Sequence, residues 1–124
     1  MALNISPEQM AQYKRTALRR LRQEQADLEQ RRQRAWQLAH EAAALLKQEF
    51  DVERVVLFGS LAHSDRFTGR SDVDLAAWGL TAKNWLKAMA AVRNLSDELE
   101  LNLVDVTCCS PELLTVIERE GVLL

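Results

Sequence analysis

The sequence is poor in the residues that interrupt or cross-link a chain, with four glycines, two prolines and two cysteines among 124 residues. Cys108 and Cys109 are adjacent, which argues against a disulfide framework or a thiolate metal site and predicts buried thiols near a strand end. No apolar run approaches the roughly 20 residues of a membrane span. The N-terminus also lacks the basic-then-apolar layout of a signal peptide. We therefore expect a cytoplasmic protein.

The net charge is small, but charged side chains are unevenly distributed along the chain. The net charge is −2, yet residues 1–34 carry eight basic and four acidic side chains, whereas residues 35–124 carry eight basic and fourteen acidic ones. A basic segment can meet nucleic acid or an acidic protein surface, while an acidic body needs cations before it can hold phosphates.

A long helix is predicted at the N-terminus. Ser6 is a suitable N-cap, Pro7 suits the first helical position and Gln9 stands where a capping box places it. Neither glycine nor proline follows until after Glu49, and one helix over this span is roughly 60 Å long, more than the width of such a small domain. We divide the chain into a basic helical arm, 1–50, and a compact domain, 51–124.

Two interpretations of the helical arm remain open. Small or apolar residues outline a heptad seam, which favours coiled-coil self-association or contact with a partner. The alternative is a solvated, charge-laced helix whose C-terminal half packs on the core. The seam residues are Ala17, Leu21, Leu28, Ala35, Leu38, Ala42 and Leu45, with Glu24 and Arg31 interrupting them.

Short apolar runs and helices alternate in the rest of the chain. Residues 54–58, 73–78 and 101–106 have the composition of strands. Thr81 is placed to cap a helix that reaches Leu95 or Leu99, and Ser110-Pro111 opens a last helix that Gly121 ends. The order predicts an α/β (α+β) fold with one small sheet.

Gly59-Ser60 directly follows the first strand. A glycine there permits a sharp turn and close approach of a ligand, and a helix beginning at Ser60 aims free N–H groups at it. This arrangement suits a phosphate. The simpler alternative is a strand-to-helix turn capped by Ser60.

Asp72 and Asp74 are separated by one residue at the start of the second strand. In a strand, residues i and i+2 point to the same face about 7 Å apart, so both carboxylates project together. They repel each other unless a cation joins them, and oxygen ligands of this kind suit Mg²⁺. A surface capping role is the alternative, but Asp74 lies in a run otherwise fit for burial.

Asp105 lies in the third apolar strand. Such a carboxylate either finds a hydrogen-bond donor, as structural aspartates do, or completes a site of three carboxylates with the pair on the neighbouring strand. Taken with the glycine turn and the paired aspartates, it outlines one anionic, phosphate-binding site.

The ordered set of Gly59-Ser60, Asp72-Val73-Asp74 and Asp105 resembles the nucleotidyltransferase superfamily of DNA polymerase beta and kanamycin nucleotidyltransferase. The sequence of residues 57–62 resembles that of its minimal members, the MntA-type antitoxins, and the likeness covers about residues 52–124. It implies a mixed sheet flanked by helices. One departure is Ala62-His63-Ser64, where Ala-Arg-Gly is usual, and this predicts weaker phosphate binding.

The resemblance also implies roles for the site residues. Asp72 and Asp74 would bind two Mg²⁺ ions and the triphosphate of ATP, while Asp105 would ligate the second ion and help activate the attacking hydroxyl. Gly59 and Ser60 would hold the β and γ phosphates. Arg70 and Ser71, which precede the pair, are assigned to the nucleotide as well, although an exposed loop arginine is an equally good description of Arg70.

The implied activity is transfer of AMP from ATP to a hydroxyl, through in-line displacement of pyrophosphate. The implied acceptor is a tyrosine of a HEPN-type toxin, which the modification silences, so that the chain acts as an antitoxin. Two alternatives remain. One is an antitoxin with a weakened catalytic site that acts by binding its toxin. The other is an RNA-directed nucleotidyltransferase that uses the basic arm.

Overall fold

A computed structural model describes residues 4–124 and contains the long N-terminal helix, α1, over Pro7–Glu49. The predicted capping box is present. The Ser6 side chain accepts a hydrogen bond from the Gln9 amide, and the Gln9 side chain accepts one from the Ser6 amide. The first three residues of the predicted arm lie outside the described residues.

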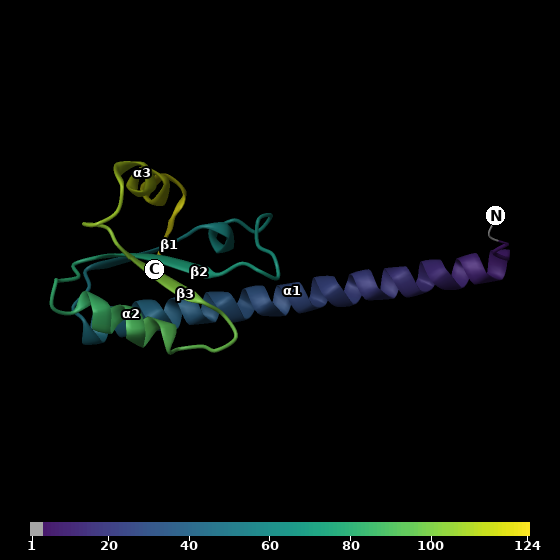
Figure 1. Ribbon diagram of the computed structural model, residues 1–124, viewed down its shortest axis with the longest axis horizontal. Helices are drawn as coiled ribbons and strands as arrows, with labels where there is room; N and C mark the ends of the chain where they lie inside the picture. The colour runs from purple at the N-terminus through teal and green to yellow at the C-terminus, as the bar shows by residue number, and fades with distance from the viewer. Residues whose placement is uncertain (1–3) are drawn as a thin grey trace.

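The two halves of α1 have different surroundings. The C-terminal half packs against the sheet through a fully covered stripe of small and apolar side chains, as one of the two interpretations predicted. That stripe consists of Ala35, Leu38, Ala39, Ala42, Ala43 and Leu46. The N-terminal half projects beyond the rest of the molecule (Figure 1), and Leu18 and Leu21 on it are about half exposed.

Four strands form one mixed sheet in the order β3-β2-β1-β4. They are β1 (Arg54–Phe58), β2 (Val73–Trp78), β3 (Leu101–Asp105) and β4 (Val122–Leu123). β1 is antiparallel to β2 and to β4, while β2 and β3 are parallel. The predicted mixed α/β class is confirmed. β4 was not predicted, because two residues after a helix carry no readable alternation.

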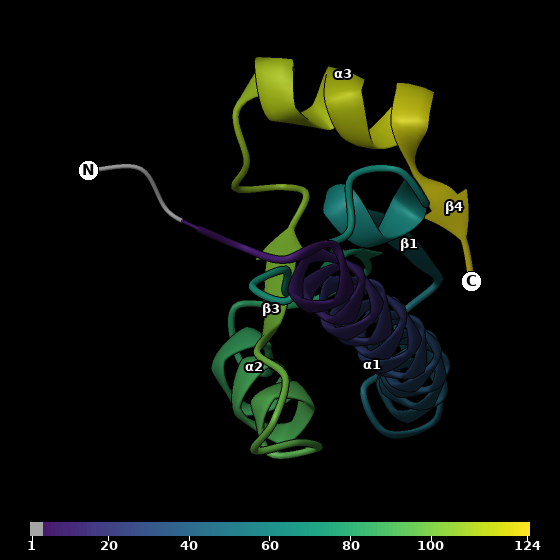
Figure 2. The same cartoon turned by 90° about the vertical axis from the view of Figure 1, so that its right-hand side faces the viewer.

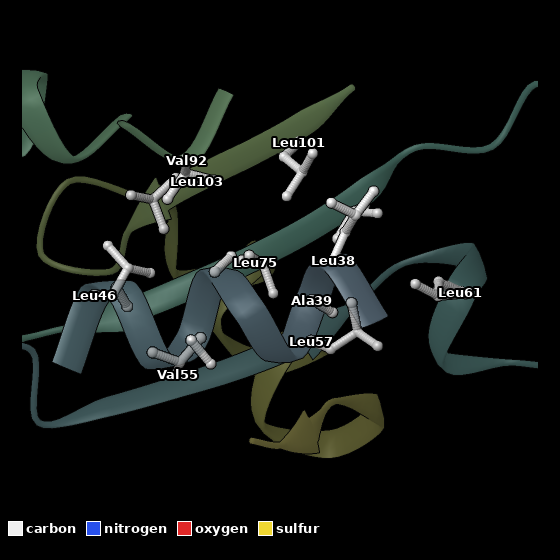
Figure 3. Packing of buried hydrophobic residues seen from close by; sticks show 14 of the residues in the cluster. Leu38, Ala39, Leu46, Val55, Leu57, Leu61, Leu75, Val92, Leu101 and Leu103 are labelled. Carbon is white, nitrogen blue, oxygen red and sulfur yellow. The ribbon is translucent and has the colours of Figure 1, made fainter. Parts of the chain in front are cut away.

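The sheet lies between two helical layers (Figure 2). α1 and α2 (Trp85–Arg93) cover one face, and α3 (Pro111–Glu120) covers the other. Figure 3 shows Leu38 and Leu46 of α1 beside Leu57 and Leu75 of the sheet. Alternate residues of the strands, such as Val56, join Ile117 of α3 in a second cluster. Both faces of the central strands are therefore buried.

The helix expected after Thr81 begins later and ends sooner than predicted. The Asn84 side chain accepts a hydrogen bond from the Thr81 amide at 2.8 Å, and the Trp85 amide donates to the Thr81 carbonyl at 3.0 Å. These bonds close a turn before the helix proper, so α2 runs from Trp85 to Arg93 only. Across residues 4–124, no helix combines the length and apolarity that crossing a membrane requires.

Candidate functional site

The turn after β1 requires a glycine. Gly59 has a φ of 77°, a backbone conformation that other residues rarely adopt. A Cβ on Gly59 would lie 2.5 Å from Oδ2 of Asp74, closer than atoms can approach without moving. The Asp74 carboxylate therefore rests directly against the backbone of the turn. The turn continues into a single 3₁₀ turn, η1 (Ser60–Ala62), which begins at Ser60.

Asp72 and Asp74 lie at the adjacent start of β2. Asp74 pairs across the sheet with Phe58 and is partly buried, and Asp72 immediately precedes the strand. Burial raises the pKa of the Asp74 carboxyl above its ordinary value. A hydrogen bond from Asn102 opposes this rise, whereas the negative charges of Asp72 and Glu100 add to it. The structure thus brings the predicted pair together at a site where negative charge is poorly compensated.

Asn102 of β3 is the immediate neighbour of Asp74. The parallel register places the two residues opposite each other, and Asn102 Nδ2 donates to Asp74 Oδ1 at 3.2 Å. Asn102 Oδ1 in turn accepts a hydrogen bond from Arg93 of α2 at 3.3 Å. An amide therefore stands where the expected third carboxylate would have to lie to share a cation with Asp74.

Asp105 does not converge on the pair. It is opposite Ala77, three residues further along the sheet than Asp74, which corresponds to about 10 Å. Because side chains alternate along a strand, Asp105 also points to the opposite face from Asp74. The predicted convergence therefore differs from the structure. The reason is the register, since β3 brings its second residue and not its last one to Asp74.

The surroundings of Asp105 are those of a structural aspartate, the other interpretation of this residue. Its Oδ1 accepts hydrogen bonds from the Thr107 amide at 3.1 Å and the Thr107 hydroxyl at 2.8 Å, which holds the turn after β3. It lines a mainly apolar cavity of about 340 Å³ with Trp85 and Cys108, among others. Cys108 is exposed and Cys109 is only partly buried, so our prediction that both thiols are buried is wrong.

The other predicted nucleotide-binding residues lie around the same end of the sheet. Ser60 begins η1 and is partly buried. Arg70 is exposed, in a tight turn in which Ser71 Oγ accepts from the Thr68 amide at 2.9 Å. The Ser71 carbonyl accepts from Arg31 of α1 at 3.3 Å. This contact ties the segment that carries Asp72 to the long helix.

His63, which follows η1, faces the end of α3. Its Nε2 lies 3.6 Å from Oε2 of Glu120, and Arg66 lies 4.0 Å from the same oxygen. Two side chains of the loop after the glycine turn therefore approach one carboxylate at the end of α3. The charged neighbour of His63 is therefore an acidic side chain.

The residues at this site fit one divalent cation better than two. Asp72 and Asp74 are close enough for their charges to interact, and the Asp74 carboxylate lies against the Gly59 turn. Mg²⁺ is commonly held by one or two carboxylates with phosphate oxygens and waters in its other positions. Among residues 4–124, however, no three or more His, Cys, Asp or Glu side chains are grouped to hold a metal.

Sequence reasoning missed the roles of Asn102 and Arg31. A signal for Asn102 was present, because Leu101-Asn102-Leu103 repeats the apolar-polar-apolar pattern of Val73-Asp74-Leu75 at the start of a neighbouring parallel strand. Arg31 was interpreted as an interruption of the heptad seam and as part of the basic arm. Its contact with the Ser71 carbonyl, forty residues away along the chain, has no local sequence signal.

Comparison with known families matches the compact part of the chain. The model of the family described as polymerase beta, nucleotidyltransferase, covers residues 40–124, from the C-terminal part of α1 through the whole sheet. A search of curated proteins found no match to the chain.

Proposed function

The chain belongs to the polymerase beta nucleotidyltransferase family, and we propose that it transfers AMP from ATP, with Mg²⁺, to a hydroxyl of a partner protein. The family supports a nucleotidyltransferase-type function in general. The observation that carries the proposal is the position of Asp74, which is held against the Gly59 turn with Asp72 on the same strand edge.

In this proposal Asp72 and Asp74 bind the cation that accompanies the nucleotide. The cation, when bound, neutralises phosphate charge and polarises the α-phosphate. Gly59 and Ser60 hold the terminal phosphates at the end of β1, and Arg70 and Ser71 contact the nucleotide from the neighbouring turn. Burial raises the pKa of Asp74, and the negative charges of Asp72 and Glu100 add to the rise; a divalent ion would stabilise the charged carboxylate against both effects, which supports this assignment.

The reaction exchanges one phosphate ester for another. The acceptor oxygen forms a bond to the α-phosphorus, the bond from that phosphorus to the bridging oxygen breaks, and pyrophosphate leaves. The hydroxyl proton is released to solvent. The contribution of the chain is to align these groups and to balance their charge, which are the main sources of catalysis in phosphoryl transfer.

A protein acceptor agrees with the shape of the molecule. The N-terminal half of α1 leaves the body at the end of the sheet where η1 and the loop before β2 lie (Figure 1). Arg31 connects that helix to the Asp72 segment, so a protein seated on the arm lies near the site. We propose a tyrosine of a HEPN-type toxin as the acceptor, which makes the chain an antitoxin.

A second candidate is an antitoxin that binds its toxin and transfers AMP poorly or not at all. Two observations favour it. Asn102 takes the place beside Asp74 where a third carboxylate would lie, and His63 is engaged by Glu120 rather than directed at a phosphate. In this case the arm of α1 would supply the contact with the toxin.

The two candidates are separated by incubating the chain with Mg²⁺, ATP labelled in the α-phosphate and the product of a neighbouring HEPN gene. We expect label and a mass gain of one or more AMP units on a tyrosine of the partner. Asp72→Asn should abolish both while leaving the complex intact. A stable complex without label would support the binding antitoxin and reject the enzyme.

A further inference from the structure

The amide of Asn102 joins two groups of opposite charge. Its Nδ2 lies 3.2 Å from Asp74 Oδ1, and its Oδ1 lies 3.3 Å from an Arg93 nitrogen. Arg93 also contacts Glu100 Oε1 at 3.3 Å, which fixes the guanidinium at the edge of the sheet. Asn102 is partly buried and lies on the edge strand β3.

The partners determine how the amide is turned. An ionised carboxylate only accepts hydrogen bonds and a guanidinium only donates them. If the amide were reversed, its NH₂ would face Arg93 and its oxygen would face Asp74, which sets donor against donor and acceptor against acceptor. The observed orientation is therefore the one that the chemistry of Asp74 and Arg93 requires.

This orientation bears on where cations can bind. An ion shared between Asp74 and residue 102 needs an oxygen from each, because Mg²⁺ and Mn²⁺ take oxygen ligands at such sites. The NH₂ group of Asn102 occupies that side of Asp74, and its oxygen is turned toward the positive charge of Arg93. A cation bound by Asp74 is therefore expected on its Asp72 side.

Resting on the proposed function, we propose that Asn102 restricts this site to a single divalent cation per bound nucleotide, and that Asn102→Asp admits a second. Aspartate has the same shape as asparagine but offers two anionic oxygens and no donor. It would face Asp74 as a second carboxylate, with Arg93 close enough to limit their repulsion in the absence of metal. In this proposal, the amide of Asn102 in place of a carboxylate is what separates this site from one that binds two metal ions.

The test counts Mn²⁺ ions bound to the full chain in the presence of a nonhydrolysable ATP analogue, by electron paramagnetic resonance titration. We expect one ion for the wild type and two for Asn102→Asp. The matched control is Asn94→Asp, which makes the same chemical change at an exposed residue after α2 and should still bind one. Circular dichroism establishes that each variant is folded.

Different failures have different meanings. Two ions in the wild type, or one in a folded Asn102→Asp variant, would overturn this inference and leave the proposed transfer standing. The wild-type count is decisive even if the variant does not fold. No bound Mn²⁺ in any of the three proteins would reject the proposed function and this inference with it.

Discussion

Asp74 and Asp105 lie in neighbouring strands with similar apolar sequences, yet their surroundings differ in almost every respect. Asp74 lies against the Gly59 turn, near Asp72, and its burial raises its pKa. Asp105 is the last residue of β3, and its Oδ1 accepts hydrogen bonds from the amide and hydroxyl of Thr107 in the turn that follows. The comparison teaches that the two carboxylates differ in where their donors come from, since Asp105 is satisfied within its own turn and Asp74 by Asn102 on the neighbouring strand.

The largest effect that tests this comparison is on transfer activity. Asp74→Asn should lower AMP transfer by at least ~100-fold, because it removes a charge that the bound metal and phosphates require. Asp105→Asn should retain transfer within about threefold, since it changes only a turn at the other end of the sheet. Initial rates with labelled ATP measure both. Equal losses would mean that Asp105 belongs to the site.

A smaller effect is expected at the glycine turn. Gly59→Ala places a methyl group against Asp74 Oδ2 in a backbone conformation unfavourable to alanine, which costs roughly 1–3 kcal/mol and displaces the carboxylate. ATP binding should weaken about tenfold or more, as measured by equilibrium dialysis with Mg²⁺. Gly69→Ala is the matched control, because a Cβ there meets no atom within 4 Å.

A still smaller effect concerns the pH dependence of stability. The pKa of Asp74 is raised in the folded chain, so the folded state binds its proton more tightly than the unfolded state does. This carboxyl therefore stabilises the fold least above its folded pKa, and stability rises as the pH falls through that value. Without metal, Asp74→Asn should melt a few degrees higher at neutral pH.

The advantage of Asp74→Asn should disappear below the ordinary pKa of aspartate, where the wild-type side chain is protonated in both states. Melting curves at several pH values, recorded with chelator, measure the difference. Asp105→Ala provides the contrast, since it removes an acceptor of two hydrogen bonds and should lower the melting temperature at neutral pH. A rise for both variants would remove the distinction between the two carboxylates.

The smallest effect is expected at the cavity beside Asp105. Cys108 is exposed and lines that cavity, at the far end of β3 from Asn102. Alkylation of the cysteines with iodoacetamide should therefore change the affinity for ATP less than about twofold. Mass spectrometry confirms modification, and dialysis measures affinity. A large loss of affinity would connect the cavity to the nucleotide site.

Local patterns in the sequence were sufficient for most of the fold. Ser6 and Ser110 mark helix starts through their own side chains, and the bounds of β1 and β2 follow apolar runs ended by glycine. Thr81 misled because Asn84 competes for the role of marking the helix start. In each case the deciding contact lies within four residues, and sequence reasoning succeeds or fails at that range.

The site depends on contacts that are remote along the chain. The pair Asp72 and Asp74 could be predicted because strand geometry alone places both on one edge. Which residue of β3 meets Asp74 depends on the register of a parallel pair whose strands are joined through α2, and no local pattern specifies it. The choice between Asn102 and Asp105 therefore required the structure.

The unpartnered half of α1 depends on its covered half for order. Helices without tertiary contacts are only marginally stable, because starting one is unfavourable while extending one is easy. Residues 35–46 are held by the sheet and serve as the start from which the preceding turns extend. Amide hydrogens should consequently exchange progressively faster toward Ser6. A partner bound to the N-terminal end of α1 would slow exchange along the arm as far as Arg31, which donates a hydrogen bond to the segment that carries Asp72.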